Sequence, residues 1–418
     1  MRVEGQWLML LFHPHLLYQI RLEGLHVRIP PAGTIARGMD FDDGVVDTSQ
    51  SKMKIETIYA DGTVLDFLRK GDTPIRFLFP ALQIHDLAAG RPMQFALRVT
   101  MPGPQGTVMA SGAVGPFRTS NYMATPLAGT YRVESVNLSR LHGLAGFAQG
   151  QGRLSGIFSR IQVDGVATIP DFRAGDNHTV RLEAQYQAAV NGLNADVQIE
   201  NAQVKTGRSV ITASGTVAGS PRQVALTFAA HNAEVQDLLR MVETSEPQMT
   251  GKVNLKAQAK FIPGPQPFPE RLQLNGDVAV EGLRFVDARR QQKMDAFSAR
   301  VRKDDPPDTR TTPEATLAAQ SETHFDRGIA YFPEIRADLP GAQARLHGTF
   351  NLLDYKVHLT GKVALQRGIS HAATGWKALL LKPLSPFFRK KNAGAVVPVA
   401  VTGTAIQPRV GANLFGSR

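Results

Sequence analysis

The chain of 418 residues contains no cysteine. This absence excludes disulfide bonds, thiolate nucleophiles and metal sites that use cysteine ligands. Long hydrophobic runs are scarce near the start, where the apolar segment 7–12 is far shorter than the roughly 20 residues that span a bilayer. Aromatic residues make up only 7% of the chain, and the basic residues are dispersed, so nucleic-acid binding is not expected.

Signature motifs of common enzymes are missing as well. The chain has no HExxH, GxSxG or Walker A sequence, and the pair His13 and His15 has no acidic neighbour to complete a metal site. The glycine-rich segment 146–156 lacks the strand-to-helix context of a dinucleotide site and predicts a turn into a strand. Asp304 and Asp305 fall in a Pro-rich stretch without burial. We therefore predict no enzyme activity, no catalytic or metal site and no cofactor.

Alternation of apolar and polar residues with a period of two is the main positive signal. It runs through 180–190 and resumes after Asn191-Gly192, a dipeptide suited to a type I′ turn. The same pattern flanks Leu353-Asp354 within 344–365 and Asp61-Gly62 within 55–67. These segments predict antiparallel hairpins that each have one apolar face.

Helical signals are few and short. Residues 231–242 predict an amphipathic helix behind an Asn232 cap, 139–147 predict a helical turn, and two prolines divide the apolar and basic segment 375–391. The predicted fold class is therefore mainly β: a long antiparallel sheet with a few short helices. The predicted divisions are an N-terminal β region (1–130), a central β meander region (131–301), a linker (302–315) and a C-terminal β region (316–418).

The net charge of +11 favours an anionic partner such as the phosphate headgroups of a membrane. The densest basic cluster follows apolar anchors, an order that suits a bilayer interface. A helix that caps the end of the sheet explains the same segment equally well. The candidate membrane-surface residues are Trp376, Lys377, Phe387, Phe388, Arg389, Lys390 and Lys391.

Four segments together resemble the AsmA-like family: 18–33, 114–131, 152–172 and 375–413, with PVAVTGTAIQP (398–408) as the best single match. The resemblance implies a long periplasmic β-sheet curled into an open trough, or taco-like groove, with an apolar inner face, behind an N-terminal membrane helix. It also implies a role in moving phospholipid between the two membranes or in keeping outer-membrane composition in balance. From this resemblance we expect the full-length protein to be anchored in the inner membrane. The anchor itself is missing from this chain.

A sheet with too few helices to cover its apolar face must bury that face against itself or a ligand. We therefore expect phospholipid acyl chains as the ligand, a membrane surface as a partner, and no covalent chemistry. Plain core packing is the alternative for each apolar position, and a scaffold for outer-membrane protein assembly, docking an envelope protein, is the alternative function. A carbohydrate-processing enzyme is a further alternative, but no paired carboxylates can be placed. The candidate lipid-groove residues are Leu182, Tyr186, Leu193, Val197, Leu346, Phe350, Val357 and Leu359.

Overall fold

A computed structural model gives the fold of the chain. It describes residues 2–4, 16–29, 54–69, 72–102, 105–116, 123–140, 143–192, 196–218, 223–261, 266, 268–289, 291–292, 295, 317–339, 342–365, 396–404 and 408–412. Two units are described separately below. Unit 1 comprises Met1–Gly175, Val180–Val204 and Ser214–Gln223, and unit 2 comprises Asp176–Thr179, Lys205–Ala213 and Val224–Arg418.

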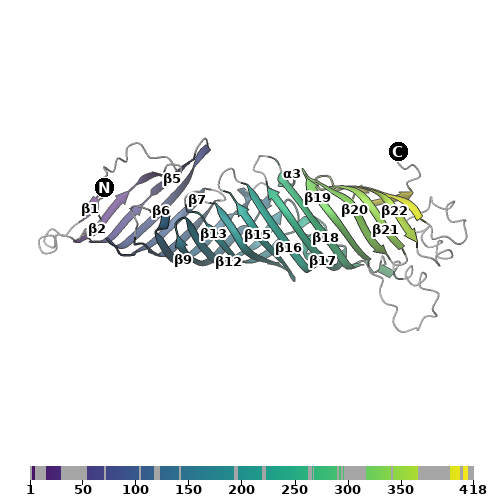
Figure 1. Cartoon of the computed structure of the whole chain (residues 1–418), viewed down its shortest axis with the longest axis horizontal. Coiled ribbons are helices and arrows are strands. Elements are labelled where there is room, and N and C mark those ends of the chain that lie inside the picture. Colours follow the sequence, from purple (N-terminus) through teal and green to yellow (C-terminus); the bar gives the residue numbers. More distant parts are fainter. Residues whose placement is uncertain are drawn as a thin grey trace, which may run out of the picture. The chain divides into compact units, whose positions relative to one another are not determined.

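Unit 1 is built from long strands that follow one another along the chain (Figure 1). From β6 to β13 each strand pairs antiparallel with the next, except that β9 pairs with β11 and the short β10 with β12. The strands are β1 (Arg2–Glu4), β2 (Leu16–Glu23), β3 (His26–Ile29), β4 (Lys54–Asp61), β5 (Thr63–Arg69), β6 (Asp72–Ala88), β7 (Met93–Pro102), β8 (Gln105–Val114), β9 (Pro126–Asn137), β10 (Leu144–Ala145), β11 (Phe147–Ile157), β12 (Arg160–Ala174), β13 (Val180–Val190) and most of β14 (Val197–Thr206).

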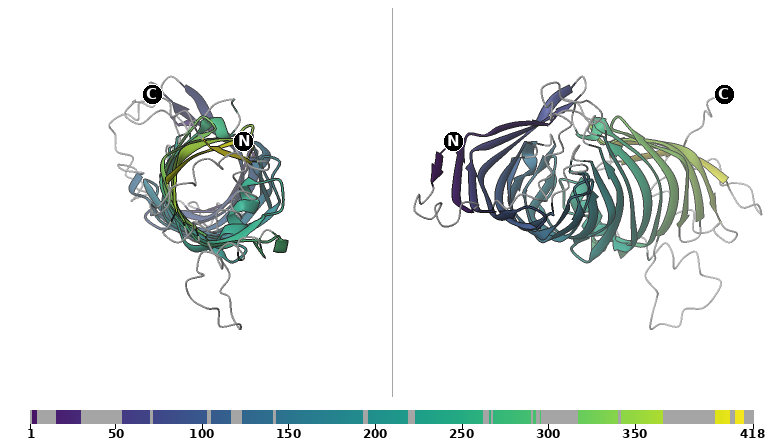
Figure 2. Two further views of the ribbon diagram at one scale, coloured as in Figure 1. Left: turned by 90° about the vertical axis from the view of Figure 1, so that its right-hand side faces the viewer. Right: turned by 60° about the vertical axis from the view of Figure 1, so that its left-hand side comes forward.

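Unit 2 repeats this design with nine strands from β16 to β24, each paired antiparallel with the next. Figure 2 shows that these strands follow one another round a curve. They are β16 (Val224–Glu234), β17 (Met249–Phe261), β18 (Leu272–Phe285), β19 (Leu317–Asp326), β20 (Ile329–Leu339), β21 (Ala342–Asn351), β22 (Lys356–Leu365), β23 (Val396–Thr404) and β24 (Pro408–Ala412). The strand β15 (Ser209–Val217) contributes residues to both units.

Helices are few and short in the described part of the chain. They include α2 (Val235–Val242), the four-residue α3 (Phe268–Arg271) and a 3-10 turn at Leu138–Arg140. None of them is long and apolar enough to cross a lipid bilayer. The mainly β prediction, an open sheet with a few short helices, is confirmed.

The sheet is mixed, however, rather than wholly antiparallel. The pairs β2–β4 and β3–β5 are parallel, and the expected hairpin within 55–67 does not form. Instead β4 continues past Gly62 into β5, and both pair with the 17-residue β6. The positive φ of Gly62, 67°, fits a turn equally well, so the dipeptide Asp61-Gly62 alone could not distinguish a reversal from a kink.

The other local predictions had mixed outcomes. The hairpin around Leu353-Asp354 is confirmed, because β21 and β22 pair antiparallel on either side of it. The two-residue turn at Asn191-Gly192 is wrong, since the Asn191 N–H donates to the Asp196 carbonyl at 2.8 Å and β14 begins only at Val197.

Segment 146–156 was predicted as a turn, but most of it belongs to β11 because pairing with β9 and β12 holds it extended. The helix predicted over 231–242 begins at Val235, behind Glu234 rather than Asn232. The β region boundaries near 130 and 301 remain predictions, and the linker 302–315 lies outside the described residues.

Candidate functional site

One face of unit 1 is apolar across at least six strands. Cross-strand partners share a face, so the register defines rows of side chains that run from strand to strand. We call the surface formed by three adjacent rows the apolar face of unit 1. The rows are Phe95, Gly112, Gly129, Leu154, Val163 and Ala188; Leu97, Ala110, Tyr131, Gly152, Gly165 and Tyr186; and Val99, Val108, Val133, Gly150, Ala167 and Ala184.

Unit 2 has an equivalent surface. Its central row passes through eight consecutive strands, and a second row beside it passes through six. We call these rows together the apolar face of unit 2. They are Ala230, Leu255, Val278, Ser321, Ile335, Leu346, Gly361 and Val399, and Val253, Val280, Ala319, Ala337, Ala344 and Val363.

Little covers these faces. Only 18 hydrophobic residues are buried in the described part of the chain, ten of them are alanines, and only Leu182 and Phe325 are larger than valine. The larger apolar side chains, such as Leu255 and Val278, remain half-buried. A closed protein core buries its large aliphatic side chains completely, and monomers rarely expose wide apolar surface. Among the residues that the structure describes, little therefore covers the two faces over most of their length.

Glycines on these faces mark places where neighbouring backbones come very close. A Cβ atom at Gly112 would clash with the Ala128 carbonyl, and one at Gly361 with the Arg345 carbonyl. Crowding of this kind is typical of a sheet that curls toward the crowded side. The strand glycines Gly276 and Gly348 lie on the same side of the sheet as the apolar face of unit 2.

A pair of tyrosines bridges the apolar face of unit 1. Tyr131 on β9 and Tyr186 on β13 are separated by two strands, yet their hydroxyl oxygens lie 2.5 Å apart. Between them, Gly152 and Gly165 leave free the space that the hydroxyls fill. Burial raises the pKa of the Tyr131 hydroxyl, and the hydrogen bond to Tyr186 raises it further. The two tyrosine side chains therefore extend over Gly152 and Gly165 on this face.

Helix α2 covers one end of the apolar face of unit 2. Val235 packs with Ala230, Ala233 and Val253, and Leu238 and Leu239 extend this contact. The helix is held by Asp237, which accepts hydrogen bonds from the Arg208 N–H and the Ser209 hydroxyl, both at 2.8 Å. Its cover is local, because it contacts β16 and β17 among the strands of unit 2.

Of the predicted groove residues that the structure describes, Tyr186 and Leu346 belong to the rows that define these faces. Leu182 lies on the same side of β13 as Tyr186, and Val197 is half-buried on β14. Phe350, Val357 and Leu359 lie on the same side of β21 and β22 as Leu346, and Phe350 faces Val357. Leu193 and the membrane-surface candidates between Trp376 and Lys391 lie outside the described residues.

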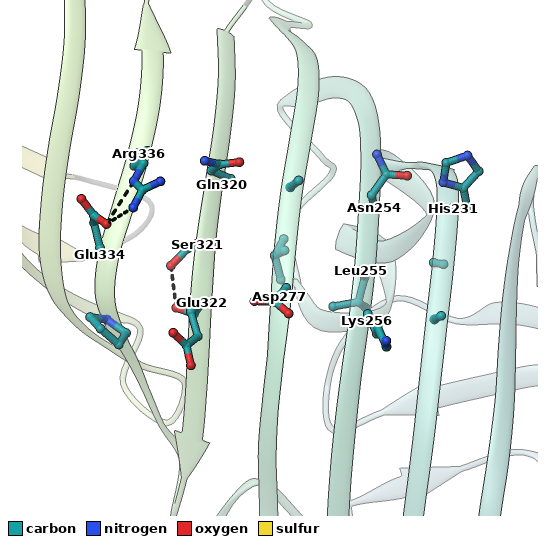
Figure 3. A pocket seen from close by; sticks show the side chains of 15 residues that line it. His231, Asn254, Leu255, Lys256, Asp277, Gln320, Ser321, Glu322, Glu334 and Arg336 are labelled. Atoms are coloured by element: carbon teal, nitrogen blue, oxygen red, sulfur yellow. Dashed lines mark hydrogen bonds and ion pairs between the residues drawn. The ribbon is translucent and has the colours of Figure 1, made fainter.

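The opposite, polar face of unit 2 carries a shallow pocket of about 650 Å³ (Figure 3). His231, Asn254, Lys256 and Asp277 line it together with Glu322, and the ion pair between Glu334 and Arg336, at 2.6 Å, borders it. The Arg336 guanidinium holds the pKa of the Glu334 carboxyl below its usual range. These mixed charges form no group of three or more possible metal ligands in the part of the chain that the structure describes.

Comparison with known proteins assigns neither a family nor a function to this chain. No family model, no curated protein and no solved structure matches this chain. The functional argument therefore rests on the two apolar faces and the residues around them.

Proposed function

We propose that this protein binds phospholipid acyl chains on its apolar faces and conveys them without chemical change. The observation that supports this proposal most strongly is the row of mainly apolar, buried or half-buried residues that continues through eight strands of unit 2, interrupted by Ser321 and Gly361. Acyl chains are flexible apolar ligands that can follow such a surface. Burial of apolar surface contributes about 0.8 kcal/mol per CH₂ group, so even a few covered methylenes give appreciable affinity.

The arrangement of the strands supports movement of a chain rather than a fixed site. Because the rows run from strand to strand, each step to a neighbouring strand offers a similar apolar contact about 4.8 Å away. A tail that leaves Val280 on β18 therefore meets Ala319 and Ala337 next. In this mechanism the headgroup stays in water at the open edges of the strands, and no side chain acts as an acid, base or nucleophile.

The location proposed for this activity is the bacterial periplasm, with the full-length protein anchored in the inner membrane and serving outer-membrane lipid homeostasis. This part rests on the family resemblance of the sequence alone. A membrane surface and an envelope protein are the partners that such a role requires.

Photocrosslinking tests the proposal with a matched pair of positions. Val163 and Val166 both lie on β12, but Val163 faces Leu154 on the apolar face, whereas Val166 is 44% exposed on the polar face. A photoreactive phenylalanine analogue at Val163 should crosslink to phospholipid in the bacterial envelope, and the same analogue at Val166 should not. Phe332 and its exposed neighbour Tyr331 on β20 provide the same comparison in unit 2.

Equal lipid crosslinking from both positions, or none from either in a folded protein, would contradict the proposal. Crosslinks from Val163 to a protein instead of lipid would favour the alternative function, a scaffold that assists outer-membrane protein assembly.

A further inference from the structure

Three arginines surround one depression on the polar face of unit 1, on the side opposite the tyrosine pair. Arg98 on β7 and Arg132 on β9 both lie opposite Met109 of β8, and Arg153 on β11 lies opposite Thr130. The depression has a volume of about 660 Å³. We call it the arginine pocket, defined by Arg98, Arg132, Arg153, Ser111, Thr130 and Gln151.

The positive charge of this pocket is largely uncompensated. Arg98 contacts Glu134 at 3.5 Å, an exposed pair that contributes little. Arg132 and Arg153 form no ion pair with any residue that the structure describes, although Asp164 lies opposite Arg153 on β12. Arg132 and Arg153 lie diagonally opposite each other on the paired strands β9 and β11, where like charges repel one another. An anion between the guanidinium groups would remove this repulsion.

The chemistry of the pocket lining suits a tetrahedral oxyanion. Ala81 and Ala96 are small residues of the lining and leave room above the sheet. Guanidinium groups bind phosphate through paired N–H donors in a fixed geometry. The hydroxyls of Ser111 and Thr130, which lie opposite each other on β8 and β9, add donors of a second kind. A mixed set of guanidinium and hydroxyl donors is typical of phosphate recognition.

We propose that the arginine pocket binds a phosphate group, carried either by an anionic lipid headgroup or by a free phosphate. The arginine side chains lie on the other side of the sheet from the apolar face, because Thr130 and Arg132 flank Tyr131 on β9, although Tyr131 is itself among the residues that line the pocket. Binding there does not depend on the proposed transport of acyl chains. Either activity can fail while the other persists.

The test compares two double variants of the whole chain with the same loss of charge. Arg132→Gln/Arg153→Gln removes the two unpaired cations of the pocket. Arg160→Gln/Arg181→Gln is the control, since these arginines are paired with Glu200 and Glu183 at 2.7 and 2.8 Å outside the pocket. Circular dichroism and thermal unfolding establish that both variants are folded.

Inorganic phosphate is titrated by calorimetry at constant ionic strength, with chloride as the balancing anion. We expect saturable binding that weakens by about tenfold or more in the pocket variant, because two charge-assisted contacts are lost. The control variant should stay within about twofold of the parent protein, since distant exposed charges are screened. Equal weakening in both variants, or no saturable binding by the parent protein, would overturn the proposal.

Cosedimentation with vesicles then identifies the source of the phosphate. Vesicles of phosphatidylglycerol that bind the parent protein and the control, but not the pocket variant, would assign the site to a lipid headgroup. Phosphate binding without such pocket-dependent vesicle binding would assign it to a free phosphate. Phosphatidylcholine vesicles control for attraction that does not depend on net lipid charge.

Discussion

The tyrosine pair and the glycines beneath it lead to a quantitative prediction about Gly165→Ala. A Cβ atom at Gly165 would collide with the Tyr131 hydroxyl, lie 3.0 Å from the Tyr186 hydroxyl and lie 2.8 Å from the Gln151 carbonyl. The hydroxyls can swing away, but the hydrogen bond between them is then lost. The backbone carbonyl of Gln151 can move far less, because β11 is paired on both sides.

The expected magnitude follows from these contacts. Overpacking costs about 1–3 kcal/mol, and loss of the hydrogen bond costs about 0.5–1.5 kcal/mol. Alanine also restricts the unfolded chain, which offsets about 0.4–1 kcal/mol. We therefore expect Gly165→Ala to lower the free energy of unfolding by about 1–3 kcal/mol. In a Tyr131→Phe/Tyr186→Phe background the same substitution should cost about 1 kcal/mol less, because the hydrogen bond is already absent.

Gly112→Ala is the matched control. A Cβ atom there meets only backbone atoms of Ala128 and Gly129, so its cost should be the same with tyrosines or phenylalanines at 131 and 186. Urea unfolding combined with hydrogen exchange in β11 and β12 measures all four combinations, since a long sheet need not unfold in one step. If Gly165→Ala costs the same in both backgrounds, the hydroxyl pair does not occupy the space above that glycine, and the reasoning fails.

Three other perturbations have defined outcomes. Asp66 is 3% exposed, and hydrogen bonds from Arg76 hold the pKa of its carboxyl well below its usual range, so Asp66→Asn should destabilise β3 and β5 at neutral pH. Because this folded-state pKa is depressed, the stabilisation is present above the unfolded value of about 4 and is lost as the pH falls below it. Ser209→Ala should lower the free energy of local unfolding of α2 by about 1–3 kcal/mol. The reason is that Asp237 loses a hydrogen-bond donor from a residue that is only 1% exposed. Charge reversal of the run Arg389–Lys391 should weaken binding to anionic vesicles if that segment contacts a membrane.

Hydrogen exchange of the affected strands or helix measures the first two changes, and vesicle cosedimentation measures the third. Thr212→Ala is the control for the α2 experiment, because the Thr212 hydroxyl is exposed and donates only to the Ala229 carbonyl, at 3.2 Å. Equal protection of β3 amides, relative to their intrinsic exchange rates, at pH 3 and pH 7 would contradict the first prediction. Unchanged exchange in α2 would contradict the second, and unchanged vesicle binding the third.

Alternation within single strands was enough to predict the β class and the faces of many side chains. Leu346 and Leu359, on neighbouring strands of one hairpin, lie on the same side of the sheet because side chains of an extended chain alternate with a period of two. The turn between them at Leu353-Asp354 was equally local, since the Tyr355 φ of 57° and the side chain of Asn351 complete it within a few residues. Such features need no knowledge of distant partners.

Pairing between strands, by contrast, was decided only in the tertiary structure. Nothing in the segment 55–67 indicates that it pairs with β6 rather than with itself, because backbone hydrogen bonds carry no residue code. The same holds for Tyr131 and Tyr186, 55 residues apart, and for the three arginines of the pocket. A strand's own sequence fixes which side chains share a face, whereas the register between strands fixes which of them meet, and register is a property of the whole sheet.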